Sequence, residues 1–367
     1  MKQFFFSFLN QIQSFFSQAE TPIADSNWQE IPESMMTQLE TLMGQLSHPS
    51  PDLISIEQEI FSRLKEWETD RKANHLVILG LPISDLKSLI AASFSEKSVK
   101  GIEVIYPFSN LTWREEPAKI IQQLKATTEI SEPLLFQTSQ QPQSKMIIIP
   151  SLEQCFLRRI GGWEAIIWLR ENIVNTSDYF WLIGCNHWAW VFLDYVCQLS
   201  AYLEARMSLP PLSGDDLQQW LQPVTNSLIP EEEEKQSSFF WNTLASMSGG
   251  NSDIAIQLWL RSIQVSIPQE TDEITELKLI TPSLPKLPAL SADDRYILHS
   301  LLLHSRIARS QLALSLGEKE DSLQGKIQIL RRQDLIKQEA ELLMVNPVYY
   351  RQIKQDLTQN NFLIGED

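Results

Sequence analysis

The sequence predicts an α/β protein: a three-layer sandwich around a parallel sheet, followed by a helical lid and a C-terminal winged helix. Short apolar runs alternate with helical patterns between residues 75 and 209. The runs are continuously apolar, as in strands that are covered on both faces of a parallel sheet. Right-handed crossovers then place helices on both faces. Beyond residue 212, helical periodicity predominates.

Composition excludes several classes of protein. The chain has 367 residues, of which 43% are hydrophobic and 21% charged, so collagen-like and wholly disordered classes are excluded. This length predicts two or three domains. The formal net charge of −16 repels phosphate backbones and anionic lipids, so nucleic acid is an unfavourable partner. Three cysteines without a CxxC motif are typical of buried thiols in a reducing cytosol and predict a cytoplasmic location.

The N-terminal segment, residues 1–52, is expected to be helical and partly flexible. Its first 18 residues are rich in phenylalanine, but the apolar stretch Phe4–Phe16 is too short to cross a bilayer. As a helix it would carry a broad apolar face. Three roles stay open for that face: packing on the protein's own core or fraying, docking a partner protein, and peripheral contact with a membrane. A helix is also expected at Pro32–Leu46.

The α/β domain is expected to span residues 53–210, beginning with a helix at Ile54–Lys72. Its strands are expected at His75–Leu79, Gly101–Tyr106, Met146–Ile149, Tyr179–Gly184 and Tyr202–Leu209. Its further helices are expected at Asp85–Phe94, Pro117–Thr127, Cys155–Val174 and Trp188–Leu199. The tryptophans that crowd around the third and fourth strands are expected in the core.

Three segments follow the α/β domain. A helical lid is expected at 211–267, where a serine cap and acidic first turn open the segment SGDDLQQWL. Its later helices are expected at Phe239–Met247 and Ser252–Val265. A proline-containing linker is expected at 268–290, and a separate domain at 291–367. In that domain we expect helices at Ala292–Leu303, Arg309–Leu314 and Asp321–Arg332, a hairpin of Leu335–Ile336 with Leu342–Val345, and a final helix after Tyr350.

The first strand is followed by a degenerate phosphate-binding loop. Gly80, Lys87 and Ser88 stand where a strand–loop–helix would hold a nucleotide phosphate. A working loop needs glycines, because its N–H groups must curl around the phosphate partly at positive φ. Here Leu86 precedes the lysine, and Asp85 adds a negative charge that would repel a phosphate by about 3 kcal/mol.

Two further strand ends carry polar candidates. The third strand runs into Pro150 where a magnesium-holding Asp is expected, and Glu153 is the nearest acid. The fourth strand ends at Asn186, which has the polar character of a γ-phosphate sensor but is also a common turn residue. Glu153 and Asn186 are therefore candidate catalytic residues. No metal site is expected, because Cys185 and His187 lack a second pair of ligands.

The order of these elements resembles the AAA+/STAND group of P-loop NTPases over residues 53–265. The segments that carry the resemblance are HLVILGLPISDLKSLI, KMIIIPSLE, YFWLIGCNHWAW, LPPLSGDDLQQWL and SGGNSDIAIQLWLRSI. The resemblance implies ATP or ADP binding with Mg²⁺ and conformational coupling to other domains. The departures at Asp85, Leu86 and Pro150 predict a pseudo-ATPase instead. A plain α/β sandwich unrelated to NTPases is the alternative.

The C-terminal domain resembles a winged helix-turn-helix. It carries ten Lys and Arg against eleven Asp and Glu, whereas a DNA-binding domain is expected to be clearly basic. We therefore expect a regulatory or scaffold protein that binds protein partners through the lid, the winged helix or the Phe-rich helix. Two alternatives stay open: a divergent ATPase or switch protein that uses Lys87, Ser88, Glu153 and Asn186, and a transcription regulator that uses Arg331 and Arg332.

Overall fold

The computed structural model describes the ranges 28–71, 73–94, 101–108, 113–128, 144–228, 238–266 and 276–365. The Phe-rich N-terminal helix that the sequence predicts lies outside the described residues. The chain divides into two compact units. One joins Met1–Pro51 to Pro210–Lys286, and the other joins Asp52–Leu209 to Leu287–Asp367.

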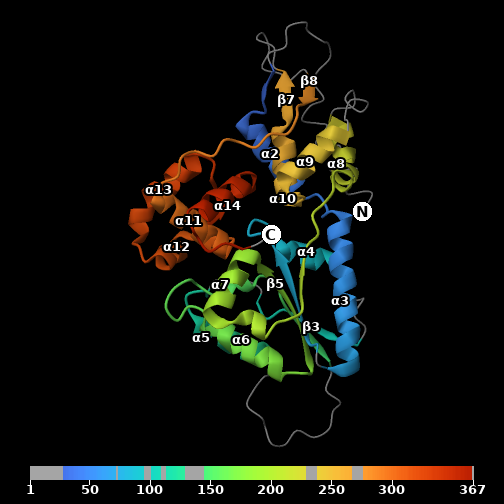
Figure 1. Cartoon of the computed structure of the whole chain (residues 1–367), viewed down its shortest axis with the longest axis vertical. Coiled ribbons are helices and arrows are strands. Elements are labelled where there is room, and N and C mark those ends of the chain that lie inside the picture. The colour runs from blue at the N-terminus through green and yellow to red at the C-terminus, as the bar shows by residue number, and fades with distance from the viewer. Residues whose placement is uncertain are drawn as a thin grey trace, which may run out of the picture. The chain divides into compact units, whose positions relative to one another are not determined.

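The second unit is built on a parallel five-stranded sheet (Figure 1). Its strands are β2 (His75–Gly80), β3 (Glu103–Ile105), β4 (Lys145–Ile149), β5 (Tyr179–Asn186) and β6 (Arg206–Ser208). Their spatial order is β3-β4-β5-β2-β6, so the first strand of the domain lies between its fourth and fifth. All five pair in parallel with their neighbours, and β2, β4 and β5 are almost wholly buried.

Helices cover both faces of this sheet and complete three layers (Figure 1). Side chains alternate along β2: Leu76 and Ile78 face one cluster, and Val77 and Leu79 face the other. The first cluster holds α3 (Ser50–Asp70) and α4 (Leu86–Ser93). The second holds α5 (Pro117–Thr128), α6 (Glu164–Asn175) and α7 (His187–Cys197).

The observed elements correct three expectations. The helix expected at Cys155–Val174 begins only at Glu164, as α6, because residues 155–163 form turns around Gly161 and Gly162. A short 3₁₀ turn at Leu152–Gln154 precedes them. The fifth strand, expected at Tyr202–Leu209, spans only Arg206–Ser208. The last helix of the lid ends at Arg261, because Ile263–Ser266 pairs as a strand on both its edges.

The rest of the second unit is the winged helix. It contains α11 (Ala292–His304), α12 (Arg309–Leu316), α13 (Glu320–Arg332) and α14 (Tyr350–Gln359). Its small antiparallel sheet has the order β10-β11-β9, formed by Ile336–Glu339, Leu342–Val345 and Ile307–Ala308. A capping box between Ser291 and Asp294 starts α11.

The first unit combines the lid with residues before the α/β domain. Its helices are α2 (Glu33–Met43), α8 (Gly214–Leu228), α9 (Ser238–Ser248) and α10 (Ser252–Arg261). Its three-stranded sheet has the order β1-β7-β8, formed by Trp28–Glu30, Ile263–Ser266 and Glu276–Leu279. Strand β8 lies inside the predicted linker, and Lys278 on β8 stacks over the ring of Trp28 on β1 at 4.0 Å.

The predicted fold class is confirmed: the chain has an α/β sandwich with a parallel sheet, a helical region and a C-terminal winged helix. Trp181, Trp188 and Trp190 are buried, as expected for the core, whereas Trp163 and Trp168 are only partly buried against it. In the described ranges, no helix has both the length and the apolar character that crossing a membrane requires.

Candidate functional site

The strand register brings two candidate residues together. Gly80 at the end of β2 pairs with Asn186 at the end of β5. Glu153 follows β4, the neighbouring strand, and its Oε2 accepts a hydrogen bond from the backbone N–H of Asn186 at 3.3 Å. Three of the predicted residues therefore meet at the carboxyl ends of adjacent strands, where ligands bind in open α/β sheets.

The loop 80–88 does not form an anion-binding nest. None of its residues has a positive φ, whereas a nest needs successive N–H groups that converge through αR and αL conformations. The chain turns instead through a β-turn, in which the N–H of Ser84 donates to the carbonyl of Leu81 at 3.0 Å. This N–H is thereby directed to the loop's own backbone.

Leu86, the first residue of α4, covers part of the loop. Its side chain is buried in the core cluster that α3 and α4 form with the sheet. It also covers the backbone of Gly80, because a Cβ at Gly80 would lie 2.7 Å from Cδ2 of Leu86. In a working P-loop this position is a glycine, which leaves the backbone open to phosphate. Here the space over Gly80 is filled with an apolar side chain.

Asp85 occupies the N-terminus of α4. It is the N-cap residue, and its Oδ1 accepts the N–H of Ser88 at 3.1 Å. A helix N-terminus attracts anions through its free N–H groups and its dipole, and here the chain's own carboxylate supplies the anion. Lys87 and Ser88 follow on the first turn with exposed side chains.

Asn186 is directed toward the winged helix. Its Oδ1 caps α7 by accepting the N–H of Ala189 at 2.7 Å. Its Nδ2 donates to the carbonyl of Leu303 at 3.2 Å and to Oγ of Ser305 at 2.8 Å. With 1% of its surface exposed, the side chain faces protein rather than solvent.

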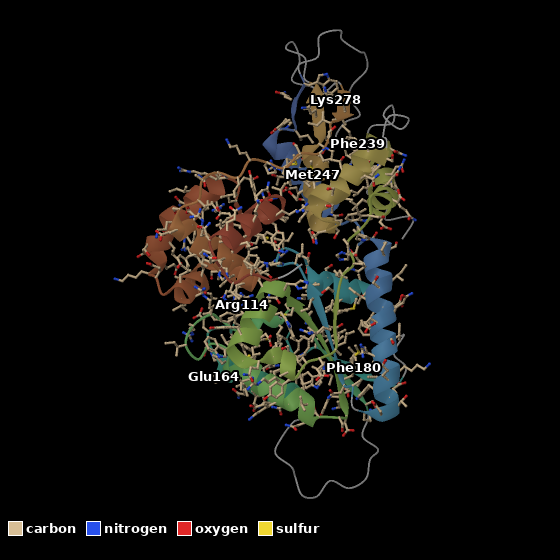
Figure 2. The ribbon with its side chains drawn as sticks, in the orientation of Figure 1. Arg114, Glu164, Phe180, Phe239, Met247 and Lys278 are labelled. Carbon is tan, nitrogen blue, oxygen red and sulfur yellow. The ribbon has the colours of Figure 1, made fainter. Side chains whose placement is uncertain are left out.

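Two residues that sequence reasoning missed complete this edge. Arg114, between the β3 region and α5, is 2% exposed, and its Nη2 donates to the carbonyl of His304 at 3.2 Å. His304 is fully buried at the end of α11, and its ring lies 5.0 Å from that of Phe156. Figure 2 shows Arg114 where the α/β sandwich and the winged helix meet. No motif marks either residue, because the contact joins positions 190 apart in sequence.

We call Arg114, Glu153, Asn186 and His304 the polar edge. Burial raises the pKa of Glu153 to about 7, although the positive charge of Arg114 and nearby N–H groups oppose the shift. Burial lowers the pKa of Arg114 to about 10, opposed by Glu153. Burial, together with Arg114 and Arg158, holds the pKa of His304 well below its usual value. The edge therefore holds one guanidinium, a carboxyl group that titrates near neutrality and a neutral imidazole.

At the expected nucleotide site, several polar groups are engaged within the protein. The N–H of Ser84 bonds to the loop's own backbone, and the N-terminus of α4 is capped by the carboxylate of Asp85. The side chain of Leu86 covers the backbone of Gly80. The donor and acceptor atoms of Asn186 bond to protein. Within the described part of the chain, no group of three or more His, Cys, Asp or Glu has the geometry to hold a metal ion.

The three cysteines are buried and unbridged. Burial raises the pKa of Cys155 to about 12 and that of Cys197 to about 11, and it also raises the pKa of Cys185 well above its usual value. Thiols held in the protonated form are poor nucleophiles and poor metal ligands. They therefore add no reactive group to the site.

No protein-family model matches the chain, and no curated protein matches its sequence. Among solved structures, the chain is similar to the Thermotoga maritima RuvB Holliday junction branch migration motor, at 14% identity and a TM-score of 0.31, over 81% of this chain and 94% of that one. It is also similar to Cdc6p from Pyrobaculum aerophilum, at 12% identity and a TM-score of 0.35, over 94% of this chain and 98% of that one. It is similar, too, to the Aeropyrum pernix Orc1 protein in complex with DNA, at 12% identity and a TM-score of 0.39, over 85% of this chain and 95% of that one.

Proposed function

We propose that this chain is a non-catalytic, AAA+/STAND-like regulatory or scaffold protein that acts through protein–protein contacts. The observation that carries the proposal is the state of the loop 80–88. Its helix N-terminus is capped by Asp85, and its glycine backbone is covered by Leu86. Both features use the protein's own atoms where a nucleotide would need free N–H groups and open space.

The surface of the winged helix supports a protein partner rather than DNA. Three of its basic side chains form ion pairs with acidic neighbours in the same domain: Arg306 with Glu339, Arg309 with Glu320 and Lys326 with Asp293. A DNA-binding face keeps such charges for phosphates. Ile329 on α13 and Leu342 on the hairpin are exposed, and apolar groups of this kind favour contact with another protein.

Calorimetric titration with ATP and ADP in the presence of Mg²⁺ tests the catalytic part of the proposal. We expect no heat of binding at millimolar nucleotide for the wild type or for Lys87→Ala. As a matched control, Lys125→Ala removes an exposed lysine from α5. Tight binding that is lost in Lys87→Ala but kept in Lys125→Ala would overturn the proposal and favour the divergent ATPase.

Titration with a short DNA duplex at low salt tests the role of the winged helix. A DNA-binding domain would bind under these conditions with an affinity that falls steeply as salt rises. We expect no salt-dependent binding. Binding that is lost in the double variant Arg331→Ala/Arg332→Ala would establish the transcription-regulator alternative and contradict the proposal of a protein-binding surface.

A further inference from the structure

The last turn of helix α11 is held by side chains from the α/β sandwich. The final carbonyls of any α-helix lack partners within the helix and need donors from elsewhere. Asn186 donates to the carbonyl of Leu303 at 3.2 Å, and Arg114 donates to that of His304 at 3.2 Å. Asn186 also donates to Oγ of Ser305, the residue that follows the helix, at 2.8 Å.

The charge at this contact is complementary. A helix C-terminus carries a partial negative charge that favours a nearby cation. Arg114 is the cation, and it is 2% exposed, so little water screens the attraction. Glu153, whose charge also favours the charged state of Arg114, lies on the same edge.

The contact is continuous with the core of the sheet. Leu303 on α11 belongs to the same buried cluster as strand residues Ile149, Trp181 and Ile183. The winged helix therefore contributes a core side chain to the α/β domain at the same turn whose carbonyls are bonded.

Two further points join the winged helix to α7. The indole N–H of Trp188 donates to the hydroxyl of Tyr350, at the start of α14, at 3.1 Å. Near the end of the chain, Gly365 lies against His187, where a Cβ would meet the backbone carbon at 2.6 Å. Both contacts lie on the first turn of α7, next to Asn186.

We propose that Arg114 and Asn186 form a binding site whose ligand is the C-terminus of helix α11, and that this site locks the winged helix onto the carboxyl edge of the sheet. The inference goes beyond the proposed function, since it holds whether or not nucleotide binds elsewhere on the chain. It assigns to Asn186 the recognition of a helix carbonyl in place of a phosphate. It also makes the sandwich and the winged helix one mechanical unit, so a partner that pulls on the winged helix acts on the sheet.

Hydrogen exchange followed by mass spectrometry tests the lock in the full chain. Asn186→Ser keeps an N-cap for α7, because serine caps as well as asparagine, but serine is too short to reach α11. We expect exchange to rise about tenfold in peptides covering residues 298–308 and 186–192, the loss expected when about one hydrogen bond's stabilisation is removed. Peptides covering α13 are expected to keep the wild-type rate, because the winged helix stays folded.

Two further variants keep the test decisive. Asn175→Ser removes an asparagine bond from an exposed position on α6 of the same sandwich, and we expect no change in either peptide. Ser305→Ala removes the hydroxyl that accepts from Nδ2 of Asn186 but keeps the bond to the carbonyl of Leu303. We therefore expect a smaller rise of exchange in the same two peptides. Unchanged exchange in Asn186→Ser would overturn the proposal, as would a rise of equal size in α13, which would mean loss of fold rather than of docking.

Discussion

The loop 80–88 and the polar edge lie at neighbouring strand ends, yet they are closed by opposite means. The loop is closed by an apolar side chain that is buried over Gly80 and by a carboxylate that caps α4. The polar edge is closed by a buried guanidinium, a carboxamide and two helix carbonyls. One region is closed by packing and the other by hydrogen bonds between buried polar groups.

The difference sets how each region responds to its surroundings. Apolar packing over Gly80 does not depend on protonation, so its contribution to stability is the same at every pH. Buried charges are stable only while they balance one another. Since the pKa of Glu153 is raised to about 7, the balance at the polar edge changes within the physiological range of pH. The following variants separate the two behaviours.

The largest effect is expected from Arg114→Met. The change keeps an apolar stem but removes the cation that faces the end of α11, and it leaves the ionised form of Glu153 without compensation. We expect the free energy of unfolding to fall by about 4 kcal/mol at pH 8. At pH 5, where Glu153 holds a proton, the loss is expected to be clearly smaller. Urea denaturation at the two pH values measures both numbers.

The control for this variant is Arg63→Met. Arg63 forms ion pairs with Glu59 and Glu66 on the surface of α3, and surface pairs contribute less than about 1 kcal/mol. An equal loss in Arg63→Met and Arg114→Met, or a loss in Arg114→Met that does not vary with pH, would contradict the assignment of a buried charge balance.

Leu86→Ala tests the packed loop. Removing a buried leucine costs the transfer of its side chain and leaves a cavity, so we expect a loss of about 3 kcal/mol. In contrast to Arg114→Met, the loss is expected to be the same at pH 5 and pH 8. If instead Leu86→Ala were neutral for stability and gained Mg²⁺-dependent nucleotide binding, the loop would be a phosphate site that a single side chain blocks.

Glu153→Gln gives a pH dependence of known sign. The pKa of Glu153 rises from 4.5 to about 7 on folding, mainly through burial. The folded protein therefore holds a proton that the unfolded chain releases, so stability is full below pH 4.5 and is lost as the pH rises to 7. Because glutamine does not titrate, we expect Glu153→Gln to be more stable than the wild type by about 3 kcal/mol at pH 8 and equal to it near pH 4.

Denaturation curves for both proteins across this range test the sign. The low pKa of His304 also makes stability depend on pH, but it does so in both proteins, and the effect largely cancels in their difference. A difference that stays constant with pH would show that Glu153 is not buried in the carboxyl form.

The two regions also differ in how far the sequence predicts them. The closed loop depends on residues within eight positions of Gly80, so its departures from a phosphate-binding loop at Asp85 and Leu86 can be read in the sequence. The cap on Ser88 and the packing over Gly80 were not predicted. The polar edge depends on contacts that join positions 119 and 190 apart. Asn186 and Glu153 were identified as candidates, but nothing local indicates that a helix end from the winged helix would be their neighbour.

The same reasoning applies to the fold. Continuous apolar runs predicted the buried strands β2, β4 and β5, because burial on both faces leaves a clear pattern. Ile263–Val265 was predicted as the end of a helix, because the strand character of β7 depends on pairing with β1 and β8 and not on its own four residues. The start of α6 was predicted nine residues too early, because the apolar residues Phe156 and Leu157 also fit a helix, whereas the chain turns at Gly161 and Gly162 before α6 begins.

The smallest effect is expected at Asp85, and it separates the cap from the charge. Asp85→Ala removes the acceptor for the N–H of Ser88 and is expected to cost about 1 kcal/mol of stability. Asp85→Ser keeps an acceptor and is expected to be within about 0.5 kcal/mol of the wild type. The serine variant also lacks the negative charge, so it is the form in which a phosphate would bind if repulsion alone excluded it. We expect no inorganic phosphate binding by calorimetry even there, because Leu86 still covers Gly80. Binding in Asp85→Ser would show that the charge, rather than the packing, closes the loop.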